Sequence, residues 1–321
     1  MIDVYYAFDP VQVLYLGEGL LITPETYTQK TFTDTSKALN RRIQCINDQE
    51  LESLAQETVN FFPGSLARNA VQEYLDQLHP RLYGSNVDPS VIMNAFESWF
   101  GKTRTFEKLH HIPNLTAHVI GQYDSHRLRK NSPPRPFMIK AAYGCGGTGN
   151  KRIQSLQELY AFLAFVESGG CTLEREDHEQ YLIEEILPVA RSPASSLFVR
   201  DDSIEILGAW DQTIVQGRYN GATYPSETKH QERLMGATLH IGELLQEEGY
   251  RGPTNVDFME TDEGIYISEV NLRYGYSHCI AAYAQDRGIE QWVIVPYNDK
   301  LNKCQDYTLD KRYAVSWENR K

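Results

Sequence analysis

The clearest alternation of apolar and polar positions in the chain runs from Asn255 to Arg273. Its apolar positions carry the branched and aromatic side chains that strands favour, namely Val256, Phe258, Ile265, Ile267 and Val270. Between the two runs, residues 261–264 (Thr-Asp-Glu-Gly) have the composition of a tight turn. The pattern therefore predicts a β-hairpin.

The polar positions of this hairpin predict an oxygen-rich face. Glu269 and Asn271 are two residues apart, so a strand points both side chains to the same side. If the chain folds back about Glu263, Asp257 lies across from Glu269. Two carboxylates and an amide oxygen would then share one face, which is a donor set that Mg²⁺ takes when it also holds phosphates. The alternative is an ordinary hairpin with a polar, solvent-facing side.

Hydrophobic periodicity and turn residues divide the rest of the chain into three units, 1–100, 101–180 and 181–321. In the first unit they predict a strand at 11–15 and helices at 48–58, 65–79 and 88–99. In the second they predict a helix at 101–110, strands at 116–121 and 136–143, and a helix at 155–169 capped by Ser155. In the third they predict strands at 181–187, 195–200 and 205–215, a glycine-containing loop at 217–225 and a helix at 230–249.

Composition narrows the classes of protein that fit. The chain has 321 residues, of which 41% are hydrophobic and 23% charged, as in an ordinary globular enzyme. Its net charge of −12 argues against binding nucleic acid as a main function. We expect neither a signal peptide nor a membrane span, because no apolar run is long enough. The 5 cysteines form no CxxC pair, which fits a reduced, cytoplasmic protein without a structural zinc site.

A glycine-rich stretch directly follows the predicted strand that carries Lys140. Gly144, Gly146 and Gly149 spell GxGxxG. A dinucleotide site would need these glycines to open a helix, a protein-kinase loop would place its lysine after them, and a Walker loop would need Gly-Lys followed by Ser or Thr. The remaining interpretation is a flap whose backbone amides cover phosphates while Lys140 neutralises them. The alternative is a glycine-rich turn with a surface lysine.

The order of these features is recognisable. A lysine at a helix start comes first, then a strand lysine with its glycine flap, a Glu-Glu strand end, and the acidic hairpin with its arginine. The residues are Lys102, Lys140, Gly144 to Gly149, Glu184, Glu185, Asp257, Glu269, Asn271 and Arg273. This order resembles the ATP-grasp superfamily of carboxylate–amine ligases over roughly residues 100–280. The resemblance implies an α/β (α+β) fold class, with two α/β lobes sandwiching ATP after an N-terminal lobe in the position of a pre-ATP-grasp domain.

Within that superfamily the chain resembles the pheganomycin-type peptide ligases. The shared positions are Ser192-Pro193, Asp211-Gln212, Tyr219, Gly221, Pro225, Asn271-Leu272-Arg273, Gly275 and His278. The chain departs from that group over Tyr274 to His278, where the group has Lys-Gly-Gly and Thr-Thr-His, and Arg191 and Ser192 stand where an acidic ribose ligand is expected. These departures put the acceptor pocket and the ribose contact in doubt rather than the ATP chemistry.

The resemblance also implies roles for matching residues. Contacts to ATP would come from Lys102, Lys140, Gly144, Gly146, Gly147, Thr148, Gly149, Glu184, Glu185, Ile186 and Leu187. Mg²⁺ would be held by Asp257, Glu269 and Asn271. Arg273 would face the transferred phosphate. His278 would bind a substrate carboxylate or take the proton of the amine, although a packed histidine is an equal alternative.

The activity implied is an ADP-forming ligase that makes an amide bond through an acyl phosphate, on amino-acid or peptide substrates of natural-product biosynthesis. Two alternatives stay open at this point, namely a kinase acting on a hydroxyl and a non-catalytic nucleotide-binding protein. Four tyrosines are candidates for an acceptor pocket, with core packing as the alternative, and these are Tyr219, Tyr224, Tyr274 and Tyr276. Arg191 and Arg200 are candidates for holding an acidic substrate group. The oligomeric state stays open, a homodimer included.

Overall fold

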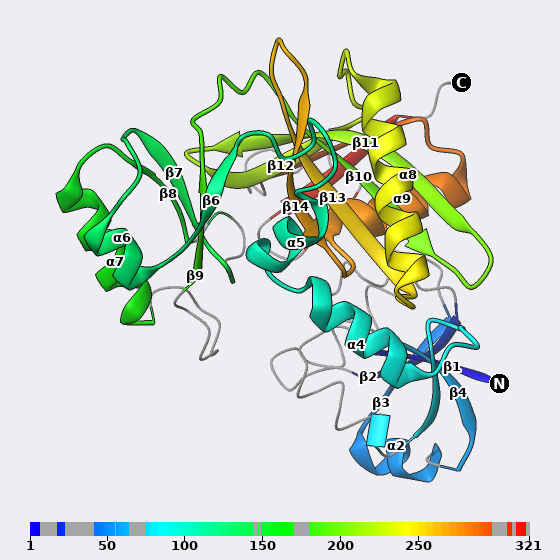
Figure 1. Cartoon of the computed structure of the whole chain (residues 1–321). Helices are drawn as coiled ribbons and strands as arrows, with labels where there is room; N and C mark the ends of the chain where they lie inside the picture. Colours follow the sequence, from blue (N-terminus) through cyan, green and yellow to red (C-terminus); the bar gives the residue numbers. More distant parts are fainter. Residues whose placement is uncertain are drawn as a thin grey trace.

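In the residues that it describes, the structure of this chain, a computed structural model, is built on three β-sheets with flanking helices (Figure 1). The described residues are 1–6, 18–22, 42–54, 56–63, 75–76, 78–143, 147, 149–169, 180–296, 307–309 and 313–318. Helices occur there together with both parallel and antiparallel strands. The α+β class predicted from the sequence is therefore confirmed.

The N-terminal lobe holds a parallel sheet of the order β3-β2-β1-β4-β5. Its elements are β1 (Ile2–Tyr6), β2 (Glu18–Ile22), β3 (Arg42–Ile46), α2 (Asp48–Leu54), β4 (Thr58–Pro63), β5 (His79–Leu82) and α4 (Pro89–Trp99). The carboxylate of Asp88 caps α4 by accepting a hydrogen bond from the backbone N–H of Ser90. The predicted strand at 11–15 and most of the predicted helix at 65–79 lie outside the described residues. The predicted helix end at His79 is wrong, because His79 begins a strand.

A small lobe contains a four-stranded antiparallel sheet of the order β6-β9-β7-β8. Its elements are β6 (Val119–Asp124), α6 (Ser125–Lys130), β7 (Phe137–Ala141), β8 (Asn150–Ile153), α7 (Leu156–Glu167) and β9 (Gln180–Glu184). The hydroxyl of Ser155 accepts a hydrogen bond from the N–H of Glu158, so the predicted cap of α7 is confirmed. The strand that opened the third predicted unit is β9, and it pairs with β6 and β7 in this lobe.

The large sheet has eight strands in the order β14-β13-β10-β11-β12-β15-β17-β16, all paired antiparallel. Its strands are β10 (Ser192–Val199), β11 (Ile204–Val215), β12 (Arg218–Tyr224), β13 (Gly252–Glu260), β14 (Ile265–Asn271), β15 (Gln291–Pro296), β16 (Tyr307–Leu309) and β17 (Tyr313–Glu318). Three helices accompany it, α5 (Lys102–Leu109), α8 (Gln231–Glu247) and α9 (Tyr276–Arg287). The helix α8 packs on β10 and β11, and Figure 1 shows the small lobe to one side of the sheet.

The glycine-containing loop predicted at 217–225 is wrong, because residues 218–224 form β12. Gly221 has a φ of 135°, and a Cβ atom there would lie 2.2 Å from the carbonyl oxygen of Ile294 on β15. Glycine is needed where two strand backbones approach so closely, so it marks a strand contact here rather than a loop.

One hydrophobic core joins the N-terminal lobe to the large sheet, whereas the small lobe has its own. The ring of Tyr83 packs edge-on against Phe198 and Tyr274, with centroids 5.9 Å and 6.3 Å away. The indole N–H of Trp99 donates to the carboxylate of Glu248 at 3.0 Å. Among the described residues, the core of the small lobe is therefore a separate cluster. Among the described residues, no helix combines the length and apolar character that crossing a membrane requires.

Candidate active site

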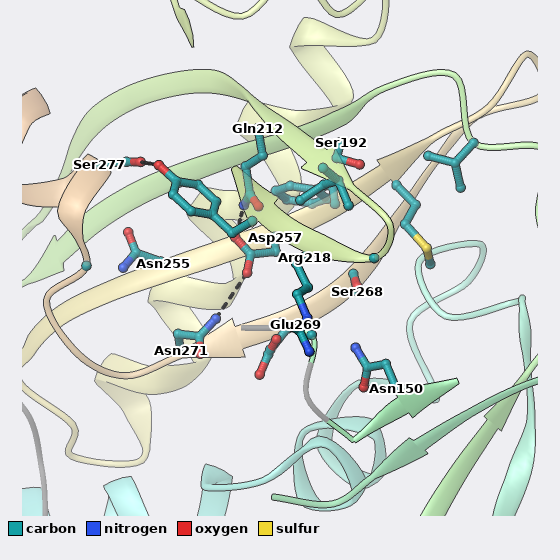
Figure 2. A pocket seen from close by; sticks show the side chains of 18 of the residues that line it. Asn150, Ser192, Gln212, Arg218, Asn255, Asp257, Ser268, Glu269, Asn271 and Ser277 are labelled. Carbon is teal, nitrogen blue, oxygen red and sulfur yellow. Dashed lines mark hydrogen bonds between the residues drawn. The ribbon is translucent and has the colours of Figure 1, made fainter. Parts of the chain in front are cut away.

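The hairpin of β13 and β14 has the register expected from the sequence. Asp257 pairs with Glu269, and Asn255 pairs with Asn271. Cross-strand partners point to the same side of a sheet, and all four side chains line one cavity. Figure 2 shows the carboxylates of Asp257 and Glu269 and the amide of Asn271 facing this space. The polar face predicted for the hairpin is therefore confirmed as the wall of a cavity.

The charged form of the Asp257 carboxyl group is disfavoured at this position. Burial and the nearby charge of Glu269 raise the pKa of Asp257 to about 7, although Arg273 partly offsets them. The Asp257 carboxylate accepts hydrogen bonds from the amide of Gln212 at 2.6 Å and the amide of Asn271 at 3.2 Å. These two amides orient the carboxylate without neutralising it.

The donor set of this face fits a hard divalent cation. Two partly buried carboxylates that repel one another gain from a positive ion placed between them. Among the described residues, no group of three or more His, Cys, Asp or Glu side chains is placed to hold a metal. A third protein ligand would therefore be the amide oxygen of Asn271, which here accepts from the guanidinium of Arg273 at 3.2 Å.

Two buried lysines reach β14 from different parts of the fold. Lys102 begins α5, is 5% exposed, and places its Nζ 3.2 Å from a carboxylate oxygen of Glu269. Lys140 on β7 is 4% exposed and donates to the hydroxyl of Ser268 at 3.2 Å. Burying an ammonium group costs free energy unless the group is paired, and a carboxylate lies beside each of these two lysines. Both predicted phosphate lysines therefore meet the strand that carries the acidic face.

Glu184 lies beneath Lys140 rather than open to the cavity. It is 2% exposed, and one carboxylate oxygen lies 2.7 Å from Nζ of Lys140, while the other lies 3.5 Å from Nε2 of His118. Burial alone would raise the pKa of Glu184, but the charges of Lys140 and His118 bring it below its ordinary value. The backbone N–H of Glu185 donates to the carbonyl of His118 at 2.8 Å, and the cavity wall is made by residues 189–192 rather than by 185–187.

The glycine flap reaches across to the large sheet. Gly147 has a φ of +85° and lines the cavity, and a Cβ atom on it would lie 2.0 Å from the carbonyl oxygen of Gly217. The backbone carbonyl of Gly149 accepts a hydrogen bond from the N–H of Ala141 at 2.8 Å. At Gly147 the glycine stretch therefore contacts the turn between β11 and β12. Gly144, Gly146 and Thr148 lie outside the described residues.

Arg273 and His278 have different surroundings. Arg273 lines the cavity, and its carbonyl accepts from the amide of Asn255 at 3.1 Å. His278 on α9 is fully buried and does not line the cavity, and its ring lies edge-on to Tyr274 at 5.1 Å. Burial lowers the pKa of His278 to about 3, so its imidazole is neutral. The structure therefore brings Arg273 to the acidic face and keeps His278 in the core.

The cavity lies between the small lobe and the large sheet and has a volume of about 930 Å³. Among the four candidate tyrosines, Tyr219 and Tyr276 line it, while Tyr224 stacks on Trp292 and Tyr274 is buried. No sequence pattern singles out several other residues that line the cavity, namely Asn150, Arg218, Ser268 and Ser277. Their polar character is visible in the sequence, but only the pairing of distant strands brings them together.

The structure is thus an α+β fold with a cavity between a small lobe and a large sheet. A family model described as "ATP-grasp domain" matches residues 101–277. The chain belongs to the ATP-grasp family. The biotin carboxylase domain of Hydrogenobacter thermophilus 2-oxoglutarate carboxylase, solved with MgADP, ADP and bicarbonate, has a similar structure. The TM-score is 0.65 at 15% identity, over 92% of this chain and 75% of that one, so the ATP-grasp fold is confirmed.

Two curated relatives match shorter stretches. One is the L-propargylglycine–L-glutamate ligase of Streptantibioticus cattleyicolor, 32% identical over 108 residues, which are 32% of this chain and 22% of the relative. The other is the [butirosin acyl-carrier protein]–L-glutamate ligase of Niallia circulans, 26% identical over 141 residues, which are 42% of this chain and 32% of the relative. The matches thus span about a fifth to a third of the relatives' own length.

Proposed function

We propose that this chain is an ADP-forming ligase that uses ATP to join the carboxylate of one substrate to the amine of another. The observation that supports the proposal is that acidic and basic side chains line the same cavity. The acidic face of Asp257 and Glu269 lines the same cavity as Lys140 and Gly147. Such an arrangement suits a triphosphate that is held partly through a divalent cation and partly by lysine.

The proposed chemistry has two bond-forming steps. A carboxylate oxygen of the first substrate attacks the γ-phosphorus of ATP, and the bond to ADP breaks, which leaves an acyl phosphate. The amine nitrogen of the second substrate then attacks the carbonyl carbon, the bond to phosphate breaks, and the amine gives up a proton. The protein's task is to align the groups and neutralise charge, because phosphoryl transfer needs little covalent help.

The residues of the site divide this task. Asp257, Glu269 and Asn271 would hold Mg²⁺, which supplies positive charge to the phosphate oxygens when bound. Lys140 would exchange its partner Glu184 in part for phosphate oxygens. Arg273, fixed beside Asn271, is placed to stabilise negative charge that develops on oxygen during both steps. The flap at Gly147 would exclude water and protect the acyl phosphate from hydrolysis.

The relatives support an amino-acid substrate. Both curated relatives are named as ligases that take L-glutamate. The cavity of about 930 Å³ has room for a nucleotide and a small second molecule. His278 has no part in the proposed steps, because its burial leaves it no contact with the cavity.

The function is tested by incubating the protein with ATP, Mg²⁺ and pairs of amino acids or short peptides, with phosphate release and mass spectrometry as readouts. We expect phosphate release that depends on both partners, together with an amide product. Glu269→Ala should lower turnover by about 100-fold or more. The matched control is Glu263→Ala, which removes an exposed carboxylate from the turn of the same hairpin and should keep full activity. A phosphorylated substrate without amide would contradict the proposal and indicate a kinase.

A further inference from the structure

Arg218, the first residue of β12, stands out among the charged residues of the cavity. Its side chain is exposed, lines the cavity and makes no hydrogen bond or ion pair with any residue that the structure describes. Figure 2 shows it extending into the cavity on the side of Glu269. A guanidinium is always charged and offers five donors in a planar fork, so it is suited to bind a carboxylate through two hydrogen bonds.

The other basic side chains that line the cavity are already engaged. Arg191 donates to Asp211 at 2.9 Å and to Glu227 at 3.0 Å, so two carboxylates compensate its charge. Lys140 is paired with Glu184 at 2.7 Å. Arg273 donates to the amide oxygen of Asn271, beside the acidic face. Within the described part of the chain, Arg218 is therefore the basic group of the cavity whose binding capacity is unused.

Arg218 lies next to the point where Gly147 contacts the turn before β12. It follows Gly217, whose carbonyl oxygen is the atom that the flap residue Gly147 approaches, and the next residue, Tyr219, also lines the cavity. The hydroxyl of Tyr219 lies 3.4 Å from that of Ser277, so two neutral hydrogen-bonding groups belong to the same wall. An anion held by Arg218 would lie in the cavity near Gly147 and Tyr219, and its partial desolvation there would strengthen the pairing.

The reaction chemistry indicates which anion this is. The carboxylate that reacts loses its charge when it is phosphorylated, whereas an α-amino acid that supplies the amine keeps its own carboxylate throughout. That carboxylate would be repelled by Asp257 and Glu269 unless a cation offsets them. Building on the proposed function, we propose that Arg218 determines substrate specificity by binding the unreacted carboxylate of an amino-acid substrate. The substrate class is thus an α-amino acid or a peptide with a free carboxylate.

The test measures binding, so it does not depend on turnover. The twenty proteinogenic L-amino acids and their α-amides are titrated into the protein with saturating Mg²⁺ and ADP, by calorimetry or thermal shift. For the amino acid that binds best, we expect the wild type to favour the acid over its α-amide by about 10- to 100-fold. Arg218→Met should remove that preference, and Arg218→Lys should restore part of it, because a lysine keeps the charge but not the planar fork.

Arg191→Met is the matched control, since it removes an arginine of the same cavity that is already paired, and it should keep the preference within about threefold. Three outcomes would overturn the inference. These are an unchanged preference in Arg218→Met, a loss of ADP affinity in that variant without loss of amino-acid affinity, and a wild type that binds none of the twenty amino acids. A wild type that discriminates as expected but makes no amide would instead contradict the proposed function alone.

Discussion

Replacing Asp257 by asparagine should stabilise the metal-free protein while abolishing its proposed activity. The pKa of Asp257 is raised from 3.8 to about 7, first by burial and then by the charge of Glu269. This difference of about 3 pH units, at 1.36 kcal/mol each, corresponds to about 4 kcal/mol. Because the cavity admits water to one side of the carboxyl group, screening reduces the effect, and we expect Asp257→Asn to gain about 2 kcal/mol near pH 8.

The gain should depend on pH in a defined direction. The folded protein holds the proton of Asp257 more tightly than the unfolded chain does, so wild-type stability falls as the pH rises from about 4 to about 7. The asparagine variant lacks this loss at Asp257. Its advantage should therefore be absent below about pH 4, grow across that window and stay constant above it. Thermal and urea unfolding in EDTA at several pH values measures this advantage, which amounts to several degrees in the melting temperature near pH 8.

Asp201 provides a control, because its replacement should change the stability in the opposite direction. Burial alone would raise the pKa of Asp201, but hydrogen bonds from Asn86 and Ser85, together with Arg251, hold it below its ordinary value. Asp201→Asn should therefore destabilise the protein near pH 8, and this loss should shrink as the pH falls through the lowered pKa. Addition of Mg²⁺ and ADP should stabilise the wild type more than Asp257→Asn. If Asp257→Asn were no more stable than the wild type near pH 8, the raised pKa of Asp257 would be refuted.

Two further substitutions test contacts of the small lobe. Gly147→Ala places a Cβ atom 2.0 Å from the carbonyl oxygen of Gly217. The rate at which the enzyme forms ADP from ATP should therefore fall at least about tenfold, with little change in melting temperature. Gly169→Ala is its control, because φ there is +81° with nothing within 4 Å, and an equal loss in both would contradict the flap contact. Glu184→Gln leaves the buried Lys140 without its charge partner and should cost about 3 kcal/mol in urea unfolding at neutral pH. Because the pKa of Glu184 is lowered from 4.5, the two proteins should converge in stability as the pH falls through that lowered value, and parallel curves would contradict the ion pair.

The predictions that the structure confirms rest on local sequence patterns. The alternation around Asp257 and Glu269 predicts which side chains share a face, whereas the pairing of these two residues also depends on a shift of register between Asp257 and Phe258. The cap at Ser155 likewise depends on residues only three positions apart. Such features need no knowledge of the rest of the fold, which is why the acidic face could be read directly from the sequence.

Features that depend on distant partners were missed. The stretch around Gly221 reads as a loop because the strand that requires its glycine, β15, lies far along the chain. The sequence suggested Arg191 and Arg200 for an acidic substrate, but each finds carboxylate partners, Arg200 pairing with Glu205 at 2.6 Å. Arg218 has no acidic partner among the described residues. Whether an arginine has a carboxylate partner depends on residues that are distant in the sequence, so a local pattern does not predict it.

The two lysines proposed to meet phosphate are both buried beside carboxylates. Lys102 is paired with Glu269, and Lys140 is paired with Glu184. An uncompensated ammonium in these buried positions would cost several kcal/mol, so each acid offsets the charge of its lysine. Binding of ATP would then exchange partners, with Glu269 passing from lysine to the cation. β14 is the strand where this exchange is concentrated, because α5 reaches it through Lys102 and the small lobe reaches it through Lys140 and Ser268. Closure of the small lobe and assembly of the phosphate site are on this view a single event, since both depend on contacts to one edge strand.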